Sequence, residues 1–462
     1  MSPARIAASL IAFGLLPAAV LGGRAGAATV LMISIDGLKP EYVTEADQRG
    51  LKIPILRGLM ADGAYADGVA GVWPTNTYPS HTTLVTGVTP AVHGIYNNPE
   101  FDPKRKFAES WFWYARQIRV PTLWQAAHRA GLATASIGWP ATVGSTDVDF
   151  LIPEYWRIFR PTEDLNPSDR YLIAALTRPE GMLERMQQSL GPYLMGNDVS
   201  LEADQSKTRF AVDILVKRKP RFMTLHLGSL DYQEHEHGPF SAAANQDLEG
   251  IDGMLGRLIA ASRMSDPEAI IVVVSDHGFV ELTHRVNLGI PFVQAGLIEA
   301  SIDPATQAAS VNSWTAEPWA ASGMAAVMLR DPGDQHALTQ VSELLGRISR
   351  EPAWGIEEIL DAKAMQKRGG FPGASFVISM KPGYYTGGNL SGDAVTDFAG
   401  HGGHGFAPHH PDMHAALFIA GRGIAPHRDL GQIDMRQVAP TVAALLGVKL
   451  RSATAAPLLV RQ

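Results

Sequence analysis

The amino-acid sequence predicts an α/β protein with a doubly wound, mostly parallel central sheet flanked by helices. Three short apolar runs rich in β-branched residues cover residues 29–35 (TVLMISI), 222–227 (FMTLHL) and 269–275 (AIIVVVS). Continuous runs of this kind are typical of strands that are buried on both faces of a parallel sheet. Helical and strand-like patterns also alternate, as in residues 121–138, where PTLWQAAHRAG precedes ATASIG. This alternation is typical of repeated βα units.

The remaining elements are predicted from their periodicity and their ends. Glycine follows several helical patterns directly, as expected at a helix C-terminus. Residues 160–205 are polar and rich in Leu and Met, which fits a helical excursion from the sheet. The other expected elements are a helix over residues 45–63, a turn at 73–80 leading into a helix over 80–87, a helix over 206–218, a last strand at 415–420 and a closing helix over 433–447.

The first 28 residues have the pattern of a signal peptide. Arg5 gives a positively charged start, an apolar stretch follows, and AGAA supplies small residues for cleavage. A permanent membrane anchor is the alternative, and Pro17 and the strand that follows directly make it the weaker interpretation. We therefore expect an exported protein, periplasmic or secreted, with no stable membrane anchor.

The composition excludes several kinds of partner and ligand. The sequence contains no cysteine, so neither a disulfide nor a thiolate is available, and Asp, His and Thr remain for chemistry. The net charge of −7 is spread along the chain, and the basic runs are no longer than the KRK segments at 104–106 and 217–219. Polymeric nucleic acid requires a concentrated positive surface, so we do not expect it as a partner. A small phosphate-containing substrate held by metal ions fits this composition better.

Residues of metal-binding types stand just past the ends of the predicted strands. In open α/β sheets the ligand site forms outside the carboxyl ends of the strands, so such side chains share one crevice. This requirement predicts a single domain over residues 29–462, with an inserted lid or subdomain at about 286–398. The candidate ligands are Asp36, Asp231, His235, Asp276, His277 and His404.

Two pairs of candidates have alternative structural explanations. Asp231 and His235 lie at positions i and i+4, so on a helix they share one face and either grip a cation or form a local ion pair. Asp276 and His277 end a strongly apolar run before Gly278, where a helix-capping turn is the alternative. Each structural explanation is reasonable for its own pair. If the chain bound no metal, however, all of these explanations would have to be true together.

His404 and Thr77 are the remaining candidates. His404 is flanked by glycine in the histidine-rich segment HGGHGFAPHHPDMH, which could instead be a solvated loop that scavenges metal. Thr77 lies in the turn WPTNTYPS and could be an ordinary turn residue. A threonine hydroxyl is a poor nucleophile unless a base or metal lowers its effective pKa, so the role of Thr77 depends on the metal cluster.

Four segments resemble the nucleotide pyrophosphatase/phosphodiesterase family of the alkaline phosphatase superfamily. They are PTNTYPSHTTLVTGVTPAVHGIYNN, DYQEHEHGP, VVVSDHG and GGHGFAPHHPDMHAALFIAG. The resemblance implies an alkaline phosphatase-like fold and two zinc ions. A His/Asp donor set without thiolate also favours zinc, and Mn²⁺ or Co²⁺ could occupy the same ligands. The resemblance implies that Asp36, Thr77, Asp276 and His277 hold one ion and that Asp231, His235 and His404 hold the other.

The resemblance also implies roles in catalysis and substrate binding. Thr77 would attack phosphorus to give a covalent phosphothreonine-type ester, which water then hydrolyses. Asn98 and the backbone N–H of Tyr78 would donate to a non-bridging oxygen. Tyr78 and Tyr155 would stack on either side of a nucleobase, which tolerates any base, and ordinary core or surface packing is the alternative for Tyr155.

The expected function is therefore an exported two-zinc phosphodiesterase/pyrophosphatase that releases nucleoside monophosphates. A phosphomonoesterase or phosphonate hydrolase is one alternative, although no basic residue lies between Trp73 and Asn98 to neutralise an extra phosphate charge. A lysophospholipid or glycerophosphodiester phosphodiesterase is another. A non-catalytic binding protein is disfavoured because the ligand set is complete. The sequence gives no indication of oligomeric state.

Overall fold

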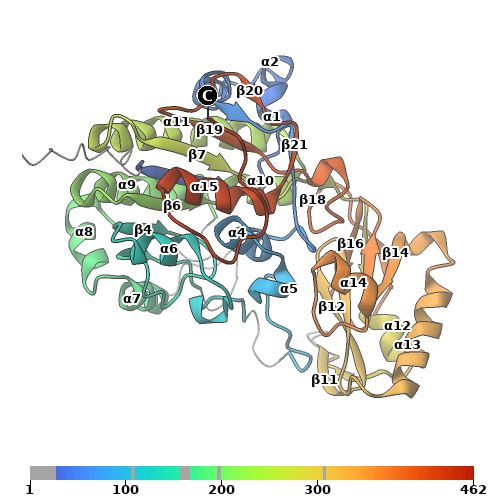
Figure 1. Cartoon of the computed structure of the whole chain (residues 1–462). Coiled ribbons are helices and arrows are strands. Elements are labelled where there is room, and N and C mark those ends of the chain that lie inside the picture. Colours follow the sequence, from blue (N-terminus) through green and yellow to red (C-terminus); the bar gives the residue numbers. More distant parts are fainter. Residues whose placement is uncertain (1–27, 106–109, 157–166, 195–198, 305–308, 462) are drawn as a thin grey trace, which may run out of the picture.

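The computed structural model describes residues 28–105, 110–156, 167–194, 199–304 and 309–461, and within them a mixed sheet of eight strands forms the centre of the larger lobe (Figure 1). Across the sheet the strands are β20 (Arg428–Asp429), β2 (Ala64–Tyr65), β19 (Leu417–Ala420), β7 (Ile270–Val274), β1 (Val30–Ile35), β6 (Phe222–Leu227), β4 (Thr134–Ile137) and β5 (Phe150–Ile152). The strands from β7 to β5 are parallel, and β19 is antiparallel to both of its neighbours. The predicted α/β class with a mostly parallel sheet is confirmed.

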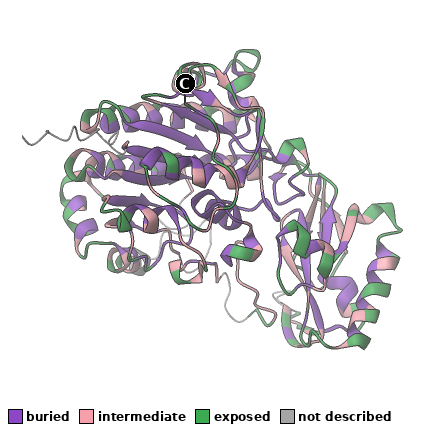
Figure 2. Cartoon of the chain, in the orientation of Figure 1, coloured by how far each residue is buried: buried purple, intermediate pink, exposed green. Residues whose placement is uncertain are grey.

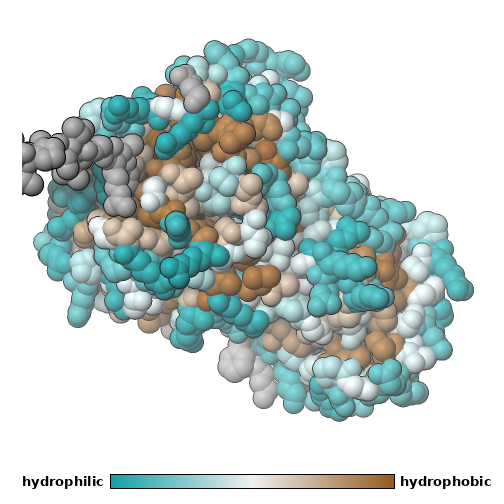
Figure 3. Space-filling model, viewed as in Figure 1, coloured by the Kyte–Doolittle hydropathy of each residue, from teal (hydrophilic) through white to brown (hydrophobic). Residues whose placement is uncertain are grey.

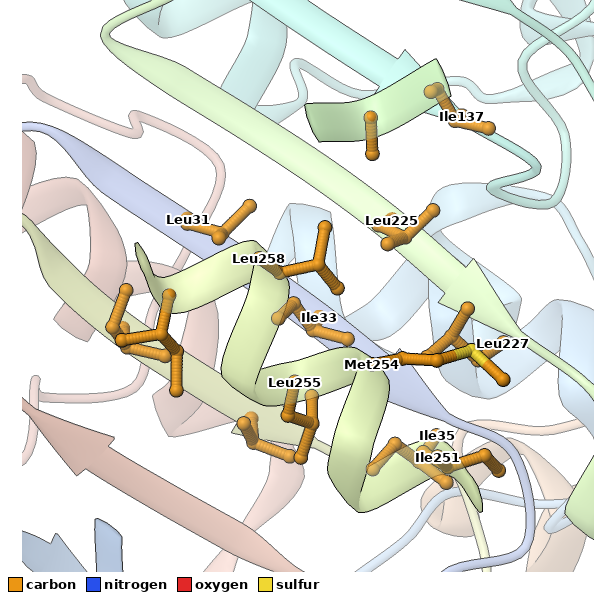
Figure 4. Packing of buried hydrophobic residues seen from close by; sticks show 14 of the residues in the cluster. Leu31, Ile33, Ile35, Ile137, Leu225, Leu227, Ile251, Met254, Leu255 and Leu258 are labelled. Carbon is orange, nitrogen blue, oxygen red and sulfur yellow. The ribbon is translucent and has the colours of Figure 1, made fainter. Parts of the chain in front are cut away.

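Strand β1 shows why the apolar runs are continuous. It lies between β6 and β7, and its side chains alternate between two hydrophobic layers, one on each face of the sheet. On one face, Leu31, Ile33 and Ile35 pack with α11 (Ala242–Ser265), as Figure 4 shows. The helix presents Ile251, Met254, Leu255 and Leu258, whose spacing places them on one side of an α-helix.

Helices cover both faces of the sheet. The layer that contains Leu31 also receives side chains from α1 (Glu41–Thr44), α2 (Ala46–Arg49), α3 (Pro54–Asp62), α7 (Pro167–Leu176), α8 (Met182–Leu190), α9 (Leu201–Arg218) and α10 (Ser229–His237). The opposite layer receives them from α4 (Thr77–Thr86), α6 (Leu123–Arg129) and α15 (Val438–Leu446). Figure 2 shows the result, with the strands of the central sheet buried and the exposed residues on the outer sides of the helices and on loops.

The predicted single helix over residues 45–63 is wrong, because this segment is divided between α2 and α3. Gly50 adopts a left-handed conformation with φ 69°, which ends α2. Ile53 precedes Pro54 and is held outside the helical region at φ −122°, so α3 begins at the proline. The helix predicted over 80–87 starts earlier, at Thr77, since Pro79 is tolerated in a first helical turn.

Residues from about 280 to 400 form a smaller lobe beside the sheet, drawn in yellow and orange in Figure 1. Its main sheet is antiparallel, with the order β12 (Ala316–Ala321), β13 (Met324–Leu329), β15 (Phe376–Met380) and β14 (Ile356–Asp361). The other elements of this lobe are β9 (His284–Asn287), α12 (Gly289–Gln294), β10 (Ile298–Ile302), β11 (Ala309–Trp314), α13 (Gln335–Ile348), η2 (Pro352–Trp354), α14 (Ala362–Arg368), β16 (Tyr384–Gly387) and β17 (Val395–Asp397).

Short elements connect the two lobes and close the larger one. They are β3 (Gly68–Ala70), α5 (Pro90–His93), η1 (Ala115–Gln117), β8 (Val280–Glu281), β18 (Gly402–Gly403), η3 (Pro411–Met413), β21 (Gln432–Asp434) and η4 (Met435–Gln437). Strands β8 and β18 pair at the junction of the lobes. Hydrophilic residues cover most of the rim of both lobes on the face drawn in Figure 3.

Two sequence predictions concern residues outside those described. The signal-peptide pattern lies almost wholly in residues 1–27, and part of the predicted excursion over 160–205 lies in 157–166 and 195–198. The described part of that excursion is helical, as α7, α8 and the start of α9. In the described residues, no helix is both long enough and apolar enough to cross a bilayer.

Candidate active site and metal centre

The carboxyl ends of three neighbouring strands bring the candidate ligands together. Asp36 follows β1, Asp276 follows β7 after one serine, and α10 begins two residues after β6. The backbone N–H of Asp36 donates to the carbonyl oxygen of Leu227, the last residue of β6, at 2.9 Å. The parallel register therefore places side chains from distant parts of the chain at one edge of the sheet.

The first group of side chains surrounds Nε2 of His277. This nitrogen lies 3.3 Å from Oδ1 of Asp36, 3.1 Å from Oδ2 of Asp276 and 3.4 Å from Oγ1 of Thr77. All four residues are buried. The four residues that the family resemblance assigns to one metal ion are thus within reach of a single small cation.

Thr77 reaches this group because it is the first residue of α4. Asn76, before it, has an extended backbone, and its side-chain amide donates to Oδ1 of Asn97 at 2.9 Å. The first turn of a helix leaves backbone N–H groups unpaired, which favours negative charge nearby. The Thr77 hydroxyl therefore stands where an anionic group would be stabilised.

The second group comprises Asp231, His235 and His404. Asp231 and His235 lie one turn apart on α10, and their Oδ2 and Nε2 atoms are 3.6 Å apart. Nε2 of His404 lies 3.9 Å from the other oxygen of Asp231. The ring of His404 stacks on that of His277 at 3.7 Å between centroids, so the two groups adjoin.

Backbone carbonyls orient the two histidines of the second group. Nδ1 of His235 lies 3.0 Å from the carbonyl oxygen of Gly402, and Nδ1 of His404 lies 3.0 Å from that of Thr75. A carbonyl only accepts, so each Nδ1 carries the proton and donates. In the neutral ring this tautomer leaves Nε2 able to bind a metal, which is the usual arrangement in metal-binding histidines.

The charges of this site are unbalanced without a cation. Burial and the neighbouring carboxylates raise the pKa values of Asp36 and Asp276 well above the usual range. Among the described residues, Oδ1 of Asp36, Oδ1 of Asp231 and Oδ2 of Asp276 are buried and have no hydrogen-bond partner. Buried carboxylate oxygens normally have partners, so these residues fit divalent metal ions.

His226 and Glu154 belong to the site and were not predicted as part of it. Nε2 of His226 lies 3.0 Å from Oδ2 of Asp36, and Nδ1 lies 3.3 Å from Oε2 of Glu154 and 3.1 Å from the Gly138 carbonyl. A histidine within an apolar strand is expected to pack in the core or to support a neighbouring ligand, and the contact of His226 with Asp36 fits the second role. The position of His226 next to the carboxyl end of β6 was the indication that the sequence offered.

Asn98 lines the site, but its hydrogen bond differs from the expected one. The backbone N–H of Tyr78 donates to Oδ1 of Asn98 at 2.9 Å, so it is already engaged within the protein. This contact also orients the Asn98 amide, since a backbone N–H can only donate. The Nδ2 group of Asn98 is therefore turned away from Tyr78 and is the donor available to a substrate.

A cavity of about 680 Å³ opens beside the two groups of ligands. Neither Tyr78 nor Tyr155 belongs to its lining in the described part of the chain, and the base sandwich by these two rings stays a prediction. Tyr78 is fully buried because its ring packs edge-on against Trp111 and its hydroxyl lies 3.1 Å from Oε1 of Glu154. Tyr155 packs against Trp113 instead.

Other aromatic and charged side chains do line the cavity. Trp111 and Trp156 lie on the side of the larger lobe, with ring centroids 4.9 Å apart. Arg285 and Tyr385 come from the smaller lobe, and Lys207 comes from α9. Basic residues distant in sequence from Thr77 therefore reach the site, which the gap in basic residues between positions 73 and 98 did not reveal.

Comparisons with known proteins agree with this arrangement. The sequence profile of the type I phosphodiesterase / nucleotide pyrophosphatase family matches residues 30–407. Member 1 of the human ectonucleotide pyrophosphatase/phosphodiesterase family is 24% identical over 260 residues, which are 54% of this chain and 23% of the relative. Venom phosphodiesterase 2 of Crotalus adamanteus is 22% identical over 55% of this chain and 27% of its own length. The chain thus spans about a quarter of the length of these relatives.

Solved structures show the same fold. Human ectonucleotide pyrophosphatase/phosphodiesterase 5 superposes with a TM-score of 0.63 at 20% identity, covering 91% of this chain and 95% of that one. The murine protein, solved as an inactive threonine-to-alanine variant in complex with AMP, superposes with a TM-score of 0.63 at 19% identity, covering 93% and 97%.

The fold and the clustered side chains define an α/β protein with an alkaline phosphatase-like sheet and a candidate metal centre at its carboxyl edge. The chain belongs to the type I phosphodiesterase / nucleotide pyrophosphatase family of hydrolases.

Proposed function

We propose that this protein is an exported phosphodiesterase or pyrophosphatase that hydrolyses nucleotide diesters or pyrophosphates to nucleoside monophosphates, with two zinc ions and Thr77 as the nucleophile. The observation that carries the proposal is the approach of the Thr77 hydroxyl to within 3.4 Å of His277, beside the buried carboxylates of Asp36 and Asp276. A threonine in an ordinary turn is not expected to contact a buried cluster of histidine and carboxylate side chains.

The donor atoms favour zinc at both positions. Asp36, Thr77, Asp276 and His277 would hold one ion, and Asp231, His235 and His404 the other. A mixture of imidazole and carboxylate without thiolate suits zinc, and Mn²⁺ or Co²⁺ could occupy the same ligands. Two such ions, when bound, supply positive charge to the attacking and leaving oxygens of an in-line displacement.

The protein's own residues then carry the reaction. Oγ1 of Thr77 attacks phosphorus as the bond to the leaving oxygen breaks, and the product is a phosphothreonine-type ester. Attack of water on this ester releases the nucleoside monophosphate and restores the hydroxyl. Nδ2 of Asn98 donates to a non-bridging oxygen in place of the Tyr78 N–H, which Asn98 already binds.

The walls of the cavity support a nucleotide substrate. Trp111 offers a partly exposed ring with Trp156 beside it, and base stacking on such rings tolerates any base. The smaller lobe supplies Arg285 and Tyr385 to the opposite part of the lining, so we propose that residues of about 286–398 act as a lid on the site. The signal-peptide pattern of residues 1–28 supports export.

Arg285 and Lys207 bear on the choice between diesters and monoesters. Both line the cavity, but Arg285 stacks over Phe398 at 3.8 Å and Lys207 is bound to Asp204 at 2.9 Å. Each of these positive charges therefore already has a partner within the protein. The lining therefore favours the smaller charge of a phosphodiester over the larger charge of a monoester.

Substrate turnover tests this proposal directly. The zinc-loaded protein is assayed with the nitrophenyl ester of thymidine monophosphate and with nitrophenyl phosphate. We expect a ratio of the two kcat/KM values far above one. A ratio below one would instead identify a phosphomonoesterase or phosphonate hydrolase, and inactivity on both would direct attention to lipid head groups.

A further inference from the structure

A second cluster of metal-binding side chains lies away from the active site. Glu357 stands on β14 of the smaller lobe, and His409 and His410 stand on the loop that follows His404. Nε2 of His410 lies 3.0 Å from one carboxylate oxygen of Glu357, and Nε2 of His409 lies 3.8 Å from the other. The two imidazole rings are 4.3 Å apart.

The loop holds the two histidines in place. Pro408 and Pro411 flank the pair and restrict its backbone. The N–H of His410 donates to the carbonyl of Ala407 at 3.1 Å, and the carbonyl of His410 accepts from Met413 at 2.9 Å. A pair that is already oriented loses less conformational entropy when it binds an ion.

The same loop is anchored to the larger lobe on both sides of the pair. Before the pair, Nδ1 of His404 donates to the Thr75 carbonyl. After it, Asp412 forms an ion pair with Lys39 at 2.7 Å, and the N–H of Gly278 donates to the carbonyl of Met413 at 3.1 Å. The loop is therefore tied to the larger lobe, while its Phe406 and Met413 also pack in the hydrophobic core of the smaller lobe, to which Glu357 belongs.

We propose that Glu357, His409 and His410 form a third metal site, which takes a borderline divalent cation such as zinc and clamps the smaller lobe to the loop that carries His404. Two imidazole nitrogens and one carboxylate are a donor set for zinc or its neighbours, and Ca²⁺ and Mg²⁺ prefer oxygen donors. The side chain of His409 is 55% exposed, so water completes the coordination. A site with three ligands at the surface binds more weakly than the buried centre.

Zinc binding to the whole mature protein tests the proposal. Bound zinc is measured by equilibrium dialysis and elemental analysis at a series of buffered free zinc concentrations, for the parent chain, His410→Ala and Glu357→Gln. His336→Ala is the control, because it removes an exposed imidazole of the smaller lobe that lies outside this cluster. We expect both site variants to bind one zinc ion fewer per chain than the parent, and the control to bind the same number.

Thermal unfolding gives a second measurement. Zinc that binds only the folded chain raises its midpoint. We expect the rise at high free zinc to be smaller in His410→Ala than in the parent and unchanged in the control. Equal zinc counts and equal midpoint shifts in all four proteins would overturn the third site, leaving a simple hydrogen bond between His410 and Glu357. Because only the difference between parent and variant is counted, this result does not depend on how many ions occupy the active site.

Discussion

The two lobes differ in how they are built and in what they supply to the site. The larger lobe has parallel strands buried on both faces, and the candidate ligands other than His404 follow the ends of β1, β6 and β7. The smaller lobe has an antiparallel sheet, and it contributes Arg285 and Tyr385 to the cavity wall. Under the proposed function, the larger lobe would carry the chemistry and residues of the cavity wall would select the substrate. Substitutions should then separate into effects on kcat and effects on KM.

Replacement of Thr77 should have the largest effect. We expect Thr77→Ala to lower kcat by at least ~10³-fold, since removal of a nucleophile leaves only the catalysis that binding supplies. Thr77→Ser keeps a hydroxyl at the start of α4 and should retain most of the turnover. Steady-state kinetics with equal metal content in all three proteins measures the difference. Full activity of Thr77→Ala would show that Thr77, at the start of α4 in the larger lobe, is not the nucleophile.

Replacement of a ligand should act through metal content. Asp231→Asn removes a charge that faces His235 and His404, and we expect zinc affinity to fall by more than the ~10- to 100-fold typical of residues that only support a ligand. Glu202→Gln is the control, because it removes an exposed carboxylate on α9 that is outside the cavity lining in the described residues. Competition with a chelator measures the affinity. Equal losses in the two variants would indicate a general charge effect rather than coordination.

The cavity wall should affect KM more than kcat. Stacking of a base on an aromatic side chain is worth ~1–3 kcal/mol, so Trp111→Ala should raise KM by about 5- to 150-fold for a nucleotide ester. The control is Trp354→Ala, which removes a partly buried tryptophan of the smaller lobe from outside the cavity lining in the described residues. A loss confined to kcat would contradict the proposed role of the wall.

The smallest effect should concern stability in the smaller lobe. Burial raises the pKa of Glu317, on β12, from 4.5 to about 7. Its carboxyl binds a proton more tightly in the folded chain, so its contribution to the free energy of unfolding is full below pH 4.5 and is lost as the pH rises to about 7. Glu317→Gln should therefore unfold at a higher temperature than the parent above pH 7 and match it below pH 4.5. The same pH dependence in both proteins would show that Glu317 titrates normally.

The sequence predicted the larger lobe better than the smaller one for a physical reason. Strands buried on both faces require continuous apolar runs, so β1, β6 and β7 were visible, and the topology of parallel sheets located Asp36 and Asp276 at their ends. The direction of an individual side chain is set by its neighbours in space. Three features depend on such neighbours, and no local pattern revealed them. The ring of Tyr78 packs in an aromatic cluster, Arg285 lines the cavity, and His226 contacts Asp36.

The steric course of the reaction at phosphorus tests the central claim most directly. A nucleotide diester made chiral at phosphorus by a sulfur substitution is hydrolysed in water labelled with a heavy oxygen isotope, and the configuration of the product is determined. Attack by Thr77 followed by attack of water inverts phosphorus twice, so the account predicts net retention. Net inversion would mean that water attacks the substrate directly, and it would contradict a covalent intermediate on Thr77.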